Sequence, residues 1–307
     1  MADAADMLVH EILVDAASDG ERLDRFLRQR LPGLSRAALA ERIKGRAVRV
    51  NGRPASKGQL LHAGDRIQTE PLAREPGPGP DPELPLRILH EDAWLVAVDK
   101  PAGVPSHALR AGERGTIASA LLARYPEMAL VGHRRLEPGL LHRLDTDTSG
   151  ILVAARDAVS FERLRAAHLR GEIDKLYLAL CSGRLEPQLA HGFLSAEQRR
   201  VRVQREPGQR GKAIATEIVS CEARGEFSLV CVRVAKAARH QVRAHLAALG
   251  HPIAGDALYG GAAVPGLRHH FLHASAVTFL HPMLDQRVQL RAELPADLLG
   301  VLAGLSI

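Results

Sequence analysis

A proline-rich segment limits the folds that this chain of 307 residues can adopt. Five of the eleven residues 75–85 are proline and two are glycine. Proline breaks a helix and cannot donate a hydrogen bond to a sheet, so the segment predicts an exposed, semi-rigid spacer. A single domain usually takes about 150 residues. We therefore expect an N-terminal domain in 1–74, a linker in 75–85 and a larger domain in 86–307.

Positive charge is concentrated before this spacer. Residues 21–68 contain 12 Lys or Arg and 4 Asp or Glu, which gives this segment a net charge of +8. The whole chain carries +6, so the remaining residues sum to −2. A basic module beside a nearly neutral one is typical of a protein that binds a polyanion such as nucleic acid. The alternative is a solvent-exposed helix face without a partner.

The order of elements in this basic module supports nucleic-acid binding. Apolar residues recur at helical spacing in 21–31, and a second helix is expected over 36–44. Residues 47–50 then alternate as a strand that leads into Asn51-Gly52, a strong hairpin signal, and a further strand is expected at 66–68. The small domain is therefore predicted to combine two helices with a short antiparallel sheet.

Two basic helices followed by such a hairpin resemble the alpha-L RNA-binding domain, first known from a small-subunit ribosomal protein. The resemblance covers roughly residues 20–70 and implies contact with structured RNA through phosphates and shape. The residues that we assign to RNA binding are Arg22, Arg25, Arg36, Arg42, Lys44 and Arg46.

The larger domain alternates strands with a few helices. No regular βαβ rhythm appears, so we predict an α+β fold with a mixed, largely antiparallel sheet. Strands are expected at 94–98, 151–155, 175–180 and 227–234, and helices at 157–171 and 241–249.

Residues 141–150, L-H-R-L-D-T-D-T-S-G, are the segment richest in reactive groups. Asp and Thr side chains often bond nearby backbone amides, so a plain turn is one interpretation. However, Arg143 and Asp145 are two apart and would lie on one side of an extended chain. A neighbouring guanidinium keeps a carboxylate ionised, as a nucleophile requires. The pattern therefore favours Asp145 as a reactive group.

The pattern H-R-L-D-x-x-T-S-G at 142–150 resembles the signature of the RluA-type RNA pseudouridine synthase family. This family converts uridine to pseudouridine, and the resemblance, which spans about 86–295, implies its fold and an isomerase activity. One segment that resembles a family motif precedes this pattern, at 98–103. Others follow it in the family's order: 175–180, 211–217, 240–245, 250–260, 272–274 and 281–282.

The resemblance also implies roles for individual residues. Asp145 would be the catalytic aspartate, Tyr177 would pack on the target uracil, and Arg243 would pair with the aspartate. The supporting role that we assign to Arg143 follows instead from its spacing to Asp145. The aspartate has three open routes: attack on the sugar, addition to carbon 6 of uracil, or service as a base towards a glycal. The isomerisation is redox-neutral, and the sequence has no phosphate-binding loop or metal-ligand spacing. We therefore expect neither a cofactor nor a metal ion.

The partner is expected to be RNA. Large-subunit ribosomal RNA is favoured because the alpha-L domain often accompanies ribosomal targets in this family, while transfer RNA stays open. No apolar run suits a membrane span or a signal peptide. Three widely spaced cysteines indicate neither a disulfide framework nor a zinc site. We expect a monomer in the cytoplasm.

Two alternative functions are considered, and the sequence differs from the family pattern in one segment. A non-catalytic RNA-binding or ribosome-assembly protein would be expected to have lost Asp145, Tyr177 or Arg243. A glycosidase would need two acids in different environments, which Asp145 and Asp147 do not provide. The family commonly has T-G-R-T before its H-Q-I-R segment, whereas residues 236–239 are Lys-Ala-Ala-Arg. This departure is expected to affect target choice rather than activity.

Overall fold

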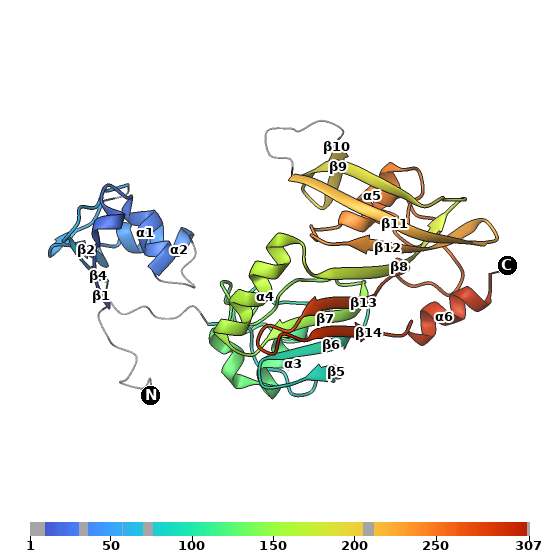
Figure 1. The fold of residues 1–307 in the computed structure, drawn as a ribbon, viewed down its shortest axis with the longest axis horizontal. Helices are drawn as coiled ribbons and strands as arrows, with labels where there is room; N and C mark the ends of the chain where they lie inside the picture. The colour runs from blue at the N-terminus through green and yellow to red at the C-terminus, as the bar shows by residue number, and fades with distance from the viewer. Residues whose placement is uncertain (1–9, 31–35, 57, 70–75, 205–211, 306–307) are drawn as a thin grey trace. The chain divides into compact units, whose positions relative to one another are not determined.

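The computed structural model describes residues 10–30, 36–56, 58–69, 76–204 and 212–305. The chain divides into two compact units (Figure 1). One comprises Met1–Pro76 with His133–Arg135, and the other comprises Gly77–Gly132 with Leu136–Ile307. Each unit is described by itself.

The small unit pairs two helices with a four-stranded antiparallel sheet in the order β1-β4-β2-β3. The predicted turn is present, since Asn51 and Gly52 both have positive φ, 51° and 78°. Strand β1 was not predicted. Apolar side chains of α1, α2 and the strands form its core, including the fully buried Leu23 and Ile67. The elements are β1 (His10–Leu13), α1 (Leu23–Arg30), α2 (Arg36–Lys44), β2 (Val48–Val50), β3 (Arg53–Pro54) and β4 (Arg66–Thr69).

The large unit contains one ten-stranded sheet. Nine strands follow the order β10-β9-β11-β12-β8-β13-β7-β6-β5, and β14 pairs with β13. All described pairings are antiparallel except β13 with β7. The predicted α+β class with a largely antiparallel sheet is therefore confirmed. The strands are β5 (Arg87–Glu91), β6 (Leu95–Lys100), β7 (Ser149–Ala155), β8 (Asp174–Ser182), β9 (Gln188–Glu197), β10 (Arg200–Gln204), β11 (Lys212–Arg224), β12 (Phe227–Val234), β13 (Leu272–Leu280) and β14 (Arg287–Arg291).

The helices of the large unit cover parts of this sheet (Figure 1). In α4, Asp157 accepts hydrogen bonds from the first-turn amides and Gly171 ends the helix in the left-handed conformation, as predicted. Helix α5 packs near β9, β10 and β11. The α-helices are α3 (Ile117–Arg124), α4 (Ala158–Arg170), α5 (Gln241–Ala248) and α6 (Ala296–Ala303), and the 3-10 helices are η2 (Ala16–Ser18, in the small unit), η3 (Pro126–Leu130) and η4 (Ala257–Tyr259).

The proline-rich segment is attached to the large unit along part of its length. The amide of Gly79 donates to the Glu113 carbonyl at 3.0 Å, and the amide of Asp81 donates to the Ser119 carbonyl at 3.0 Å. A Cβ at Gly79 would lie 2.6 Å from the carbonyl oxygen of Gly112, so this close approach requires glycine. Beyond Gly77 the segment thus differs from the exposed spacer that the sequence predicted.

The parallel pairing of β7 with β13 fixes the end of the H-R-L-D-x-x-T-S-G segment. Gly150 has φ 108°, and a Cβ there would lie 2.3 Å from the carbonyl oxygen of Ala274 on β13. Only glycine fits this position. Residues 144–148, just before Gly150, therefore lie at the N-terminal end of β7, where the candidate site is found.

Candidate active site

Backbone contacts on both sides hold Asp145 in place. The hydroxyl of Ser106 accepts from the Leu144 amide at 3.0 Å and donates to the Leu144 carbonyl at 2.7 Å. On the other side, the carbonyl of Thr146 accepts from the Gly103 amide at 2.9 Å. The loop that follows β6 therefore fixes the backbone on both sides of Asp145.

Lys100 also holds the backbone next to Asp145. Its fully buried ammonium donates to the carbonyls of Pro101, Val104 and Thr146 at 2.7–2.8 Å. Burial lowers the pKa of Lys100 to about 7, although the nearby carboxylates of Asp147 and Asp145 oppose this shift. No role was predicted for Lys100, and its only signal in the sequence was its place in the segment 98–103, which resembles a family motif.

Arg243 on α5 joins two carboxylates that are distant in sequence. Its Nη1 donates to Asp145 Oδ2 at 2.8 Å, while its Nε and Nη2 donate to Asp256 at 2.6 and 2.8 Å. Burial lowers the pKa of Arg243, but hydrogen bonds to Asp256 and Asp145 outweigh it, so the pKa is raised. The guanidinium also lies 5.2 Å from the ring centre of Tyr259. Arg243 is thus a permanently charged, rigidly held partner for Asp145.

Asp256 was not predicted. The sequence analysis placed it in the segment 250–260 without a role. Its side chain is 1 % exposed and binds Arg243 in the bidentate geometry that suits a guanidinium. It acts as the anchor that orients Arg243.

Tyr177 on β8 lines the same pocket as Asp145 and Arg243. Its side chain is buried, and burial, together with the charge of Asp145, raises its pKa above the ordinary range, so the phenol stays protonated. His240 also lines the pocket, with Nε2 at 3.8 Å from Asp145 Oδ2. The structure therefore brings together Asp145, Tyr177 and Arg243 from three separate segments.

Arg143 does not pair with Asp145. Its Nη1 donates to Glu137 Oε1 at 3.0 Å and lies 3.3 Å from His107 Nε2. The prediction that Arg143 and Asp145 are paired neighbours is therefore wrong, because alternate residues share a side only in a regular strand and residues 143–145 precede β7. Arg143 nevertheless lines both the pocket that contains Asp145 and the groove beside it.

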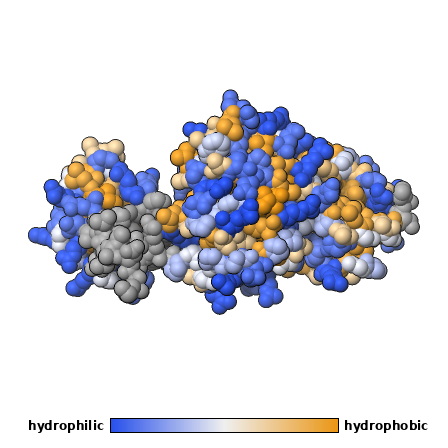
Figure 2. Space-filling model, turned by 90° about the horizontal axis from the view of Figure 1, so that it is seen from below, coloured by the Kyte–Doolittle hydropathy of each residue, from blue (hydrophilic) through white to orange (hydrophobic). Residues whose placement is uncertain are grey.

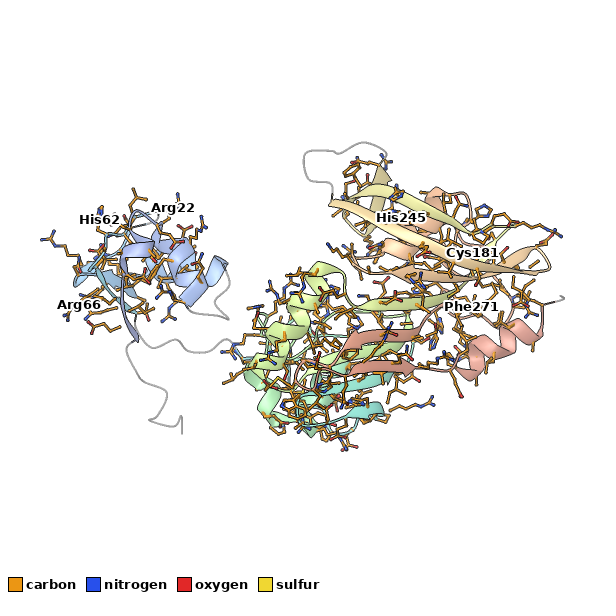
Figure 3. The ribbon with its side chains drawn as sticks, in the orientation of Figure 1. Arg22, His62, Arg66, Cys181, His245 and Phe271 are labelled. Atoms are coloured by element: carbon orange, nitrogen blue, oxygen red, sulfur yellow. The ribbon has the colours of Figure 1, made fainter. Side chains whose placement is uncertain are left out.

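The predicted RNA-binding residues of the small unit differ in their contacts. Arg22 pairs with Asp24 at 2.9 Å and Arg25 with Glu21 at 3.1 Å. Figure 3 shows Arg22 projecting from the surface of this unit. Lys44 and Arg46 are exposed, and no described carboxylate lies within ion-pair distance of them.

Arg36 and Arg42, the remaining two predicted RNA-binding residues, lie in α2. Arg42 is half-buried and has further contacts. Arg36 begins α2, but its side chain lies outside the described residues. Lys44 and Arg46 are therefore the members of the set best placed to meet phosphate.

Among the described residues, no group of three or more His, Cys, Asp or Glu side chains is arranged to hold a metal ion. No described helix is long and apolar enough to cross a membrane. Figure 2 shows hydrophilic residues over much of the visible surface of each unit, with smaller hydrophobic areas among them.

Comparison with known proteins identifies the class. Residues 94–248 match the RNA pseudouridylate synthase family and residues 21–67 match the S4 domain, which is an RNA-binding domain. An uncharacterized RNA pseudouridine synthase of Chloroflexus aurantiacus is 35% identical over 96% of this chain and 93% of its own length. This chain belongs to the RNA pseudouridine synthase family and is an RNA-modifying isomerase with an N-terminal S4 domain.

Other relatives and solved structures agree. A protein of Xanthomonas campestris named ribosomal large subunit pseudouridine synthase D is 30% identical, over 99% of this chain and 95% of its own length. A similarly named protein of Nitrosomonas europaea is 32% identical, over 96% and 87%. The structure of human RNA pseudouridylate synthase domain containing 1 shares the fold, with a TM-score of 0.54, 24% identity and 69% of this chain covered. The predicted family and fold are thereby confirmed.

Proposed function

We propose that this enzyme isomerises uridines of large-subunit ribosomal RNA, with Asp145 as the catalytic residue. The observation that carries the catalytic assignment is the 2.8 Å hydrogen bond from Arg243 to Asp145 in a pocket that Tyr177 also lines. The names of the Xanthomonas and Nitrosomonas relatives support the choice of RNA. Transfer RNA is the second candidate substrate.

The proposed chemistry follows from the charges in the pocket. The reaction breaks the bond from the ribose to N1 of uracil and forms one from the ribose to C5. C5 releases its hydrogen to solvent as a proton, and N1 takes up a proton from solvent. Arg243 donates a hydrogen bond to the Asp145 carboxylate, and each of the three routes uses that group as an anion. Tyr177 is protonated, so in this proposal it packs on the uracil rather than removing a proton. The uridine must leave its stack to reach this pocket, at a cost of a few kcal/mol.

The isomerisation neither oxidises nor reduces its substrate, so in this proposal Asp145 works without a metal ion or organic cofactor. We further propose a monomer that meets ribosomal RNA in the cytoplasm. The division of labour is a basic module in 1–74 that holds RNA, a connection in 75–85 and a catalytic domain in 86–307.

The choice of RNA is tested by comparing pseudouridine maps of all cellular RNA with and without the gene for this protein. We expect one or a few large-subunit ribosomal positions to lose pseudouridine and transfer RNA to be unchanged. Expression of the wild-type enzyme should restore the lost positions, and the Asp145→Asn variant should not. Loss of pseudouridine only from transfer RNA would contradict the proposed target.

The role of the small unit is tested by the double variant K44Q/R46Q. Each phosphate contact contributes roughly 0.7 to 0.9 to the slope of log affinity against log salt. We expect the variant to flatten that slope by about 1.4 to 1.8 and to bind ribosomal RNA more weakly, with a smaller effect on the single-turnover rate at saturating RNA. The measurement is a filter-binding series from about 50 to 200 mM salt.

A matched control removes the same charge from residues that are already paired. In R30Q/R66Q the lost guanidinium groups are those that pair with Asp15 and Glu11 in the same unit. We expect its salt slope to stay close to that of the wild type. Equal slopes for all three proteins would show that Lys44 and Arg46 only face solvent.

A further inference from the structure

Arg239 lies where the sequence departs from the family pattern, and its contacts define a second feature of the groove. Its Nη2 donates to the carbonyl of Arg199 at 2.8 Å, and its Nη1 lies 3.5 Å from the carbonyl of Gln198. Gln198 and Arg199 form the two-residue turn between β9 and β10. Arg239, in the segment 236–239, therefore holds the tip of this hairpin by hydrogen bonds.

The tip needs such support because its backbone is strained. Gln198 has φ 31°, which is unfavourable for a residue other than glycine. The next strand is held from a second side, since the Val201 amide donates to the Tyr259 hydroxyl at 2.8 Å. Tyr259 in turn packs against Arg243, the partner of Asp145. The hairpin tip and the catalytic carboxylate are thus held by one continuous set of contacts.

The tip presents an unpaired positive charge to the groove. Arg199 is exposed and lines an open groove of about 1210 Å³, which Asp145 and Arg239 also line. No carboxylate of the described residues pairs with Arg199. By contrast, Arg200 and Arg202 on β10 both pair with Glu197, at 3.5 and 3.2 Å. Within this hairpin, Arg199 is therefore the described arginine without a carboxylate partner.

We propose that the tip of the β9–β10 hairpin is an RNA-binding element, in which Arg199 contacts the phosphate backbone beside the flipped uridine and Arg239 is its positioning residue. This inference rests on the proposed RNA substrate. A guanidinium forms strong paired hydrogen bonds with phosphate. Because the groove includes Asp145, a phosphate bound there belongs to nucleotides that neighbour the target. Target choice then depends on the Lys-Ala-Ala-Arg segment through the hairpin that it holds.

The first test compares R199Q with R202Q, two exposed changes of the same charge in one hairpin. For R199Q we expect the half-saturating concentration of large-subunit ribosomal RNA to rise between about 2- and 10-fold, and the salt slope to fall by roughly 0.7 to 0.9. The rate at saturating RNA should change less than the half-saturating concentration. R202Q should match the wild type in affinity and slope. Equal behaviour of R199Q and R202Q would overturn the proposal.

The second test asks whether Arg239 acts through the turn or binds RNA itself. If it positions Arg199, the double variant R199Q/R239Q should bind no more weakly than the weaker of the two single variants. R239K should recover part of the affinity, because lysine still donates to a carbonyl. Additive losses in the double variant would overturn the positioning role.

The assays separate this proposal from the proposed function. Binding is measured by filter retention on full-length protein, and isomerisation by tritium release from RNA that carries 5-tritiated uridine. A wild-type enzyme that binds ribosomal RNA without isomerising it contradicts the target proposed above. The comparison of R199Q with R202Q judges the hairpin through binding alone.

Discussion

An Asp145→Asn enzyme is expected to lose isomerisation by at least about a thousandfold while it binds RNA within a few-fold of the wild-type affinity. The amide oxygen can still accept the hydrogen bond from Arg243, so the pocket keeps its geometry. It carries no negative charge, however, and cannot serve as nucleophile or base. The measurement is single-turnover tritium release from RNA that contains 5-tritiated uridine, beside a binding assay.

The matched control is Asp147→Asn, the same change two residues along in the same turn. Asp147 is exposed and occupies a variable position of the H-R-L-D-x-x-T-S-G pattern. We expect this enzyme to retain most of its turnover. Substantial turnover by the Asp145 variant, or an equal loss in both variants, would show that the catalytic group lies elsewhere.

The parts of the fold that the sequence predicted are those that neighbouring residues determine. The bounds of α4 follow from Asp157 and Gly171, and the β2–β3 turn follows from Asn51-Gly52. Strand β1 was missed because its place depends on pairing with β4, about 55 residues later in the chain, from Leu13 with Arg66 to His10 with Thr69. The strand order of the large sheet could not be predicted either, because it also depends on pairing between distant segments.

In the candidate site too, the sequence predicted which residues matter but not which residues they contact. A local pattern located Asp145, and the family resemblance located Tyr177 and Arg243. The partners of these groups depend on the direction of each side chain after folding. Arg143, two residues from Asp145, turns to Glu137, whereas Arg243, 98 residues away, pairs with Asp145. Asp256 and Lys100 were unassigned because their roles consist of contacts that no sequence spacing encodes.

Replacement of Arg243 by glutamine is expected to reduce both stability and activity. The Asp256 side chain is 1 % exposed and would lose its bidentate partner, and an unpaired buried charge costs about 3–5 kcal/mol of unfolding free energy. Asp145 would lose the same cation, so turnover should fall by at least about a hundredfold. Trp94, the single tryptophan, lies in the large unit, so its fluorescence during urea unfolding reports the stability of that unit.

A second variant separates these two consequences. In R243Q/D256N the buried carboxylate is replaced by a neutral amide, so most of the lost unfolding free energy should return. Turnover should not return, because Asp145 still lacks its guanidinium. If the double variant regained turnover together with stability, Arg243 would matter only as a structural ion pair. If it regained stability alone, the arginine would act on the reacting carboxylate, with Asp256 as the group that holds it there.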